Sequence, residues 1–175
     1  MQFITWSYRY AEQILNSKLT TKKEIEEIIR SVKLEDAINA APKTLGAEKV
    51  SKGLRPQLNI LFDNEFRKRN WERQSKVFGD KEELESKIDF LKDRVGIEVA
   101  FTHRSYLGID LLKFQTMSYS YLDSIDVGVY LVMTNVLMEK YPKALNGSLT
   151  FDRVKTYLPH FKSAIQVPIY VYGLE

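Results

Sequence analysis

The chain has 175 residues, of which 44% are hydrophobic, and its formal net charge is +3. This length suits one domain with a buried core, and the slightly basic charge permits a nucleic-acid partner without requiring one. The chain has no cysteine and two histidines, which excludes a disulfide framework, a cysteine metal site and a histidine-rich metal site. No long apolar run or signal-peptide pattern is present, so we expect no membrane span and a cytoplasmic protein.

Helical patterns dominate the N-terminal part of the chain, after a short strand or lead-in at Phe3–Trp6. The expected helices, each with apolar residues at helical spacing, are Tyr8–Asn16, Lys22–Val32, Leu34–Asn39 and Pro56–Asn70. Thr20 or Thr21 is expected to cap the second helix, because Glu24 follows Thr21 at capping-box spacing.

The segment Lys43–Arg55 contains two glycines and four basic residues. We predict a basic loop there, which ends at Pro56. Proline suits the first turn of a helix, so Pro56 is expected to begin the helix that follows.

Strands and helices alternate in the second half of the chain. The expected strands are Trp71–Phe78, Ile88–Leu91, Val95–Phe101, Ser124–Met133 and Val167–Tyr172. The expected helical segments are Lys81–Ser86, Gly108–Tyr121, Asn135–Lys140 and Phe151–Tyr157. Ser124–Met133 is nearly all apolar, as in an interior strand, and Pro168 suits a sheet edge or a strand entry. This order predicts an α/β fold in which a mixed central β-sheet is flanked by helices, in one domain over residues 1–175.

Two acidic residues, Asp89 and Glu98, lie nine positions apart within this strand-rich region. From Val95 to Phe101 the odd positions are apolar, so Glu98 points away from the main apolar layer. The segment Lys92–Arg94 can turn the chain back, and Asp89 can then lie across from Glu98 in a hairpin. Two carboxylates that converge on one face can hold a hard divalent cation such as Mg²⁺.

The segment Asp89-Phe-Leu-Lys-Asp-Arg-Val-Gly-Ile-Glu98-Val-Ala-Phe, followed by Ser124-Ile-Asp-Val-Gly-Val129, resembles the PD-(D/E)xK nuclease superfamily. It resembles most closely the BglII/BstYI family of type II restriction endonucleases. Weaker similarity touches most of the chain, but only the core from Asp89 to Val129 is specific. A bare acidic pair at this spacing would be common by chance, and the flanking motifs make the resemblance stronger.

The resemblance implies a restriction-endonuclease-like fold, usually dimeric, that cleaves double-stranded DNA at a short palindrome with Mg²⁺ and no organic cofactor. A recognition site with a GATC core would fit the resemblance, and this expectation comes from the resemblance alone. Asp89 and Glu98 would be metal ligands, and the main-chain carbonyl of Val99 would complete the coordination. The metal would polarise the scissile phosphate and lower the pKa of a bound water.

Ala100 departs from the family pattern, because the position two after the glutamate usually carries lysine, glutamate or glutamine. A methyl group can neither orient water nor stabilise charge. Three interpretations follow. The role would have moved to the next helix, where Lys113 or Gln115 could reach the same face; the metal alone would position the water, with a reduced rate; or the chain would be an inactive or engineered form. We favour the first of these.

Two segments are candidate DNA contacts. Thr102, His103, Arg104 and Ser105 precede an expected helix, whose free N–H groups favour a phosphate, and an arginine there could read guanine. An exposed polar connection would explain the same residues. The basic loop offers Lys49, Lys52 and Arg55, against the alternative of a solvated loop.

Three other functions compete with a homodimeric restriction endonuclease. A repair or structure-specific nuclease could share the same metal core. A DNA-binding protein that has lost cleavage is credible because of Ala100. A small interaction domain would leave Asp89 and Glu98 as exposed sheet residues, and it explains the paired carboxylates poorly.

Overall fold

The computed structural model describes residues 1–40, 47–78, 86–101, 103–120 and 123–175, with residues 47–52 described as backbone only. Its centre is a six-stranded sheet in the order β1-β6-β5-β4-β3-β2. The strands are β1 (Phe3–Tyr8), β2 (Glu72–Lys76), β3 (Lys87–Lys92), β4 (Val95–Val99), β5 (Val127–Met133) and β6 (Ile169–Leu174). β4, β5 and β6 run parallel, whereas β1, β2 and β3 each pair antiparallel with a neighbour, which confirms the predicted mixed sheet.

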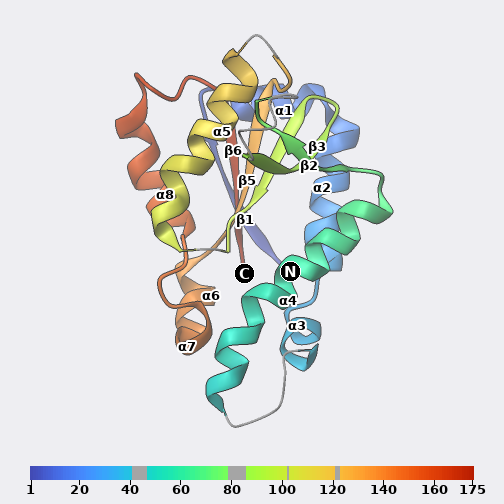
Figure 1. Ribbon diagram of the computed structural model, residues 1–175, viewed down its shortest axis with the longest axis vertical. Coiled ribbons are helices and arrows are strands. Elements are labelled where there is room, and N and C mark those ends of the chain that lie inside the picture. Colours follow the sequence, from blue (N-terminus) through green and yellow to red (C-terminus); the bar gives the residue numbers. More distant parts are fainter. Residues whose placement is uncertain (41–46, 79–85, 102, 121–122) are drawn as a thin grey trace.

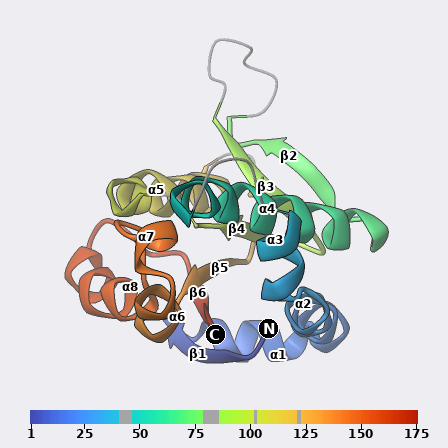
Figure 2. The same cartoon turned by 90° about the horizontal axis from the view of Figure 1, so that it is seen from below.

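Helices cover both faces of the sheet (Figure 1). They are α1 (Ala11–Ser17), α2 (Leu19–Ser31), α3 (Leu34–Ala40), α4 (Ala47–Lys68), α5 (Leu107–Tyr119), α6 (Asn135–Lys140), α7 (Pro142–Leu145) and α8 (Phe151–Tyr157). Two 3-10 turns, η1 (Arg104–Tyr106) and η2 (Leu158–Phe161), precede α5 and follow α8. Figure 2 shows α5 and α8 on one side of the sheet and α2 and α3 on the other. No helix in the described part of the chain is long and apolar enough to cross a membrane.

The strand period of two divides the core into two layers. On β5, Val129 and Leu131 face the layer formed with α1–α4, whereas Tyr130 and Val132 face the layer formed with α5 and α8. Every residue of β5 is buried, as predicted for an interior strand. β6 also lies inside the sheet, so Pro168 marks a strand entry and not an edge.

Helix α4 corrects the predicted basic loop. The helix begins at Ala47, so the predicted loop is wrong from that residue on, and Pro56 lies inside the helix and not at its start. A proline in a helix interior costs about 3 kcal/mol. The fully buried stripe Leu54, Leu58, Phe62 and Phe66 packs against the sheet and outweighs this cost, at about 1.5–3 kcal/mol for each large side chain. Residues 41–46, which include Lys43, lie outside the described residues.

Other boundaries also differ from the sequence-based expectations. α2 begins at Leu19, and no side chain caps it, so the predicted threonine cap is wrong. Thr21 donates instead to Asp93 Oδ2 at 2.6 Å, and Glu24 accepts from Lys92 Nζ at 2.9 Å, because both side chains find partners on the sheet. Tyr8 ends β1 and does not begin a helix. Residues 81–85 of the predicted helical turn at Lys81–Ser86, and the predicted end of a helix at Tyr121, fall outside the described ranges.

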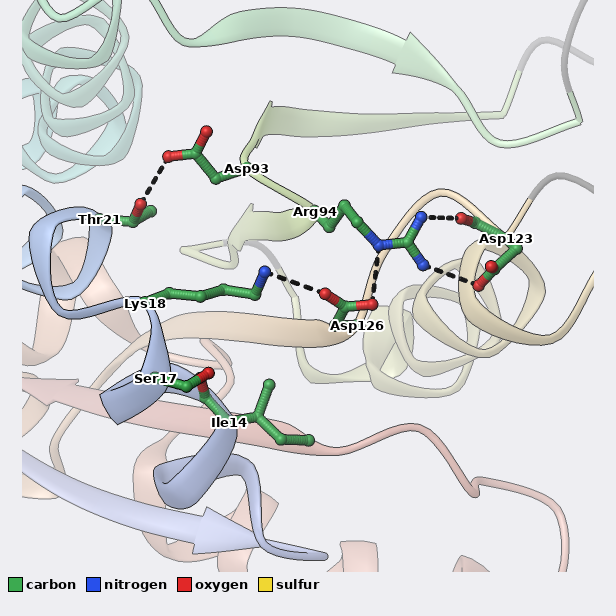
Figure 3. A network of polar contacts seen from close by, with 8 residues as sticks. All are labelled: Ile14, Ser17, Lys18, Thr21, Asp93, Arg94, Asp123 and Asp126. Atoms are coloured by element: carbon green, nitrogen blue, oxygen red, sulfur yellow. Dashed lines mark hydrogen bonds and ion pairs between the residues drawn. The ribbon is translucent and has the colours of Figure 1, made fainter.

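A network of polar contacts holds the turn between β3 and β4 (Figure 3). Asp93 and Arg94 have φ angles of 50° and 61°, as in the two-residue turns that join antiparallel strands. Arg94 Nε donates to Asp126 Oδ1 at 2.7 Å, and Lys18 Nζ lies 2.9 Å from Asp126 Oδ2. Arg94 also donates to Asp123 Oδ1 at 2.8 Å. The predicted turn is confirmed, and the network fixes the register of the hairpin that carries Asp89 and Glu98.

Candidate active site

Asp89 and Glu98 converge on one cavity. The pairing of β3 with β4 ends at Phe90 and Ile97, and Asp89 and Glu98 are the next residues beyond this pair on the two strands. Asp89 Oδ2 accepts a hydrogen bond from the Val99 backbone N–H at 2.8 Å, which orients the carboxylate. Both acidic residues line a cavity of about 460 Å³. The hairpin predicted from the sequence therefore does bring the two carboxylates together.

Glu98 is almost fully buried, with 4% of its surface exposed. It points away from the layer formed with α1–α4, as predicted, but it faces α5 and not solvent. Burial raises the pKa of Glu98 to about 9, and the negative charges of Asp89 and Asp110 add to this effect. The site therefore brings carboxyl groups together in a poorly solvated place, where a bound cation would favour their charged forms.

Lys113 brings a positive charge to this carboxylate from helix α5. Its Nζ donates to Glu98 Oε1 at 2.9 Å and lies 3.4 Å from Asp110 Oδ1. Burial alone would lower the pKa of Lys113, but Glu98, Asp110 and Asp89 together outweigh burial, and the pKa lies above its usual value. Gln115, the other predicted candidate, accepts hydrogen bonds from the backbone N–H groups of Gln166 and Val167 at 2.6 and 3.0 Å. Its amide thus holds the lead-in to β6, and it does not line the cavity.

Asp110 is a member of the site that the sequence reasoning missed. It is buried, and the Tyr130 hydroxyl donates to its Oδ2 at 2.7 Å. Burial raises the pKa of Asp110, whereas the hydrogen bond from Tyr130 and the charge of Lys113 oppose the rise. Its position in the sequence could have indicated this role, because Asp110 lies three positions before Lys113 and residues at that spacing share one helix face.

Polar side chains from β2 and α4 form another part of the wall. Gln74 Nε2 lies 3.4 Å from Asp89 Oδ1, and Gln74 has a φ of 55°, which is unusual for a residue other than glycine. Arg73 Nε pairs with Asp63 Oδ1 at 2.5 Å. All three residues line the cavity. Nothing in their sequence spacing indicated that they would share a cavity with Asp89.

The predicted DNA contacts fall in two places. His103, Arg104 and Ser105 are exposed immediately before α5, and the His103 side chain caps η1 by accepting from the Ser105 N–H at 3.3 Å. Thr102 lies outside the described residues.

The second place is helix α4, which contains Lys49 and Lys52, whose side chains the structure does not describe. Arg55 donates to the carbonyls of Ala144 and Asn146 at 3.1 and 2.5 Å, so its guanidinium joins α4 to α7.

The oxygen donors suit Mg²⁺ in an open site. In the part of the chain that the structure describes, no three acidic, histidine or cysteine side chains are grouped so that they could hold a metal ion. Mg²⁺, however, is commonly held by one or two carboxylates, with waters and substrate phosphates as the other ligands. Asp89 and Glu98 meet that requirement. The Val99 carbonyl accepts from the Phe101 N–H at 3.2 Å, which leaves it a second lone pair.

Comparisons with known proteins concern the family and the fold of the chain. A family model described as restriction endonuclease BglII/BglIII matches residues 3–174. The fold is similar to a solved structure titled "Crystal structure of restriction endonuclease BGLII complexed with DNA 16-mer", with a TM-score of 0.73 and 21% identity. The match covers 99% of this chain and 76% of that chain. A search of curated proteins found no match.

Proposed function

This chain belongs to the BglII/BglIII family of restriction endonucleases, which are type II site-specific deoxyribonucleases, and we propose that it cleaves double-stranded DNA at a short palindrome with Mg²⁺. The observation that carries the proposal is the convergence of Asp89 and Glu98 on one cavity. One nuclease domain would span residues 1–175 and act in the cytoplasm. A recognition site with a GATC core is part of the same proposal.

Asp89, Glu98 and the carbonyl of Val99 would hold the metal. When bound, Mg²⁺ would supply positive charge that polarises the scissile phosphate and lowers the pKa of a water. The protein's own contribution is orientation. The Val99 N–H holds one oxygen of Asp89, and Lys113 holds one oxygen of Glu98, so neither carboxylate is free to rotate away from the cavity.

Contacts to DNA would come from polar residues in two other parts of the chain. Thr102, His103, Arg104 and Ser105 precede α5, where backbone N–H groups and side chains suit a phosphate. Lys49 and Lys52 of α4 are proposed phosphate contacts. Arg55 is a weaker candidate, because its guanidinium already donates to two carbonyl groups of the protein.

A homodimer would match a palindromic site, because each copy offers one cleavage cavity and a palindrome presents two equivalent strands. Helix α5 supports this proposal. Ile109, Leu112 and Tyr119 on this helix are each more than half exposed, with 54%, 56% and 58% of their surface accessible. A second copy of the chain could cover this apolar face.

A DNA-binding protein without cleavage is the second candidate function, and Ala100 is the observation that favours it. Digestion of phage DNA with and without Mg²⁺, followed by sequencing of the fragment ends, separates the candidates. Discrete fragments with common ends would support the restriction enzyme. Random nicking would indicate a repair nuclease, and salt-sensitive binding without cleavage would indicate the second candidate.

Substitution of the acidic pair tests the site itself. We expect Asp89→Asn and Glu98→Gln each to abolish cleavage and to leave DNA binding, because each change removes a negative ligand oxygen and keeps the side-chain shape. Cleavage assays and gel-shift titrations on the same preparations measure both properties. Wild-type cleavage rates in both variants would overturn the assignment.

A further inference from the structure

The side chain at Ala100 cannot take part in chemistry. It follows the last residue of β4, two positions after Glu98; it lines the cavity, and it is 3% exposed in the layer that α5 covers. A polar side chain at this position would enter the cavity from the strand. Because Ala100 has only a methyl group, a polar side chain at this part of the cavity has to come from the facing helix.

Helix α5 supplies a cation there. Lys113 lines the cavity and contacts Glu98 Oε1 at 2.9 Å, and only 17% of its side chain is exposed. Among the described residues that line the cavity, the one other cation is Arg73, and it is paired with Asp63. The positive charge next to the acidic pair is therefore that of Lys113.

Two further residues restrict the position of this ammonium group. Asp110 Oδ1 lies 3.4 Å from Lys113 Nζ, one helical turn before it. The other oxygen of Asp110 accepts from the hydroxyl of Tyr130, a fully buried residue of β5. A lysine side chain has four flexible bonds, and contacts on two sides limit its freedom. Tyr130 thus ties the carboxylate of Asp110, and through it Lys113, to the centre of the sheet.

We propose that Lys113 is the third catalytic residue of this site, reaching it from helix α5 in place of a side chain at Ala100, and that Asp110 and Tyr130 are its positioning residues. The proposal rests on the cleavage function proposed above. In hydrolysis, the oxygen of a water bonds to phosphorus and the bond from phosphorus to one bridging oxygen breaks. The water gives a proton to solvent, and the leaving oxygen takes one from solvent. Lys113 transfers no proton and donates a hydrogen bond to the non-bridging oxygen on which negative charge accumulates.

The first test is Lys113→Met, which keeps the length of the side chain and removes its charge. With saturating Mg²⁺ and DNA in single turnover, we expect the cleavage rate constant to fall about 100- to 1,000-fold, as when one stabilising donor is removed. DNA affinity, measured without the metal, should change far less. A variant that cleaves at the wild-type rate would overturn the proposal. If the wild-type chain cleaves no DNA, the proposed function itself is wrong. That outcome differs from a failure of the Lys113 assignment, in which the wild-type chain cleaves and the variant cleaves equally fast.

Chemical rescue gives a sharper test, because the chain contains no cysteine. Lys113→Cys carries a single thiol, and 2-bromoethylamine converts it to a thioether analogue of lysine. Iodoacetamide adds a neutral group and is the matched control. We expect cleavage to return after the first reagent and not after the second. Mass spectrometry would verify that the thiol is fully aminoethylated. If such protein still binds DNA but does not regain cleavage, the role of the ammonium group is refuted.

A double-mutant comparison tests the positioning residues. Tyr130→Phe removes one hydroxyl group and should lower the rate constant with little change in KM. If the hydroxyl acts through Lys113, adding Tyr130→Phe to Lys113→Met should cause little further loss. Losses that multiply in full would show that Tyr130 acts independently of Lys113, and this part of the proposal would then be wrong.

Discussion

Gly128 lies on β5 beneath the ring of Phe114, and alanine at this position should push helix α5 away from the sheet. A Cβ atom at Gly128 would lie 2.8 Å from two ring carbons of Phe114 and 3.1 Å from a third. Carbon atoms pack best at about 3.5–4.0 Å, so the ring would have to retreat by about 0.7 Å. Lys113 precedes Phe114 in the chain, so the same displacement would move its ammonium group relative to Glu98.

The expected cost follows from two opposing effects. Overpacking of this kind costs about 1–3 kcal/mol. Alanine also restricts the unfolded chain more than glycine does, which stabilises the folded state by about 0.5–1 kcal/mol. Gly128→Ala should therefore lower the free energy of unfolding by about 0–2.5 kcal/mol, with a central value of about 1 kcal/mol. In a chain of this size, Tm would fall by about 2–4 °C for each kcal/mol.

Gly108 provides the matched control. It lies in the first turn of α5, and a Cβ there would meet no atom within 4 Å. Gly108→Ala should stabilise the protein by about 0.5–1 kcal/mol through helix propensity. Urea unfolding of both variants, with cleavage rates measured on the same samples, checks the prediction. If Gly128→Ala proves as stable as Gly108→Ala, α5 does not pack on β5 as closely as the structure shows. Adding Phe114→Leu should recover part of the loss, because the two positions are in contact.

Three further changes test the scaffold by urea unfolding. The pKa of Glu65 is lowered to about 2 by hydrogen bonds from Lys68 and Arg69, so its stabilising effect is present above its unfolded pKa of 4.5 and is lost as the pH falls toward 2. Glu65→Gln should therefore cost about 1 kcal/mol at pH 7 and nothing at pH 2, and an equal cost at both would contradict this cause. Arg94→Ala should cost about 1 kcal/mol and speed amide exchange at Asp126, whose N–H donates to the Arg94 carbonyl; unchanged exchange would mean that the turn holds without the arginine. Leu58→Ala should cost about 2–5 kcal/mol, because this side chain is fully buried, and a cost below about 1 kcal/mol would show that α4 packs loosely there.

The sequence was informative where one local pattern decides the structure. The alternation from Val95 to Phe101 predicted β4, and the apolar run before Met133 predicted the buried strand β5. It misled where a long-range contact overrides a local preference. Gly53 and Pro56 suggested a loop, but burial of the stripe that contains Leu58 makes the same segment helical.

The site shows the same division. The sequence pattern predicted the turn at Asp93 and Arg94 and the pairing of the two strands. It could therefore predict that Asp89 and Glu98 lie close together. The choice between Lys113 and Gln115 could not, because it depends on how α5 is rotated against the sheet, and packing of the whole layer determines that rotation. Asp110 was missed for the same reason, since its partner Tyr130 is 20 positions away.

The acidic pair and the lysine that faces it lie on different secondary-structure elements. The hairpin of β3 and β4 brings Asp89 and Glu98 together by local folding, whereas Lys113 arrives only when α5 docks on the sheet. A partly opened molecule that retains the hairpin would still attract a metal ion but would lack the ammonium group. In the proposed mechanism, cleavage would therefore require α5 to be docked on the sheet, and a molecule in which α5 has moved away would not cut DNA.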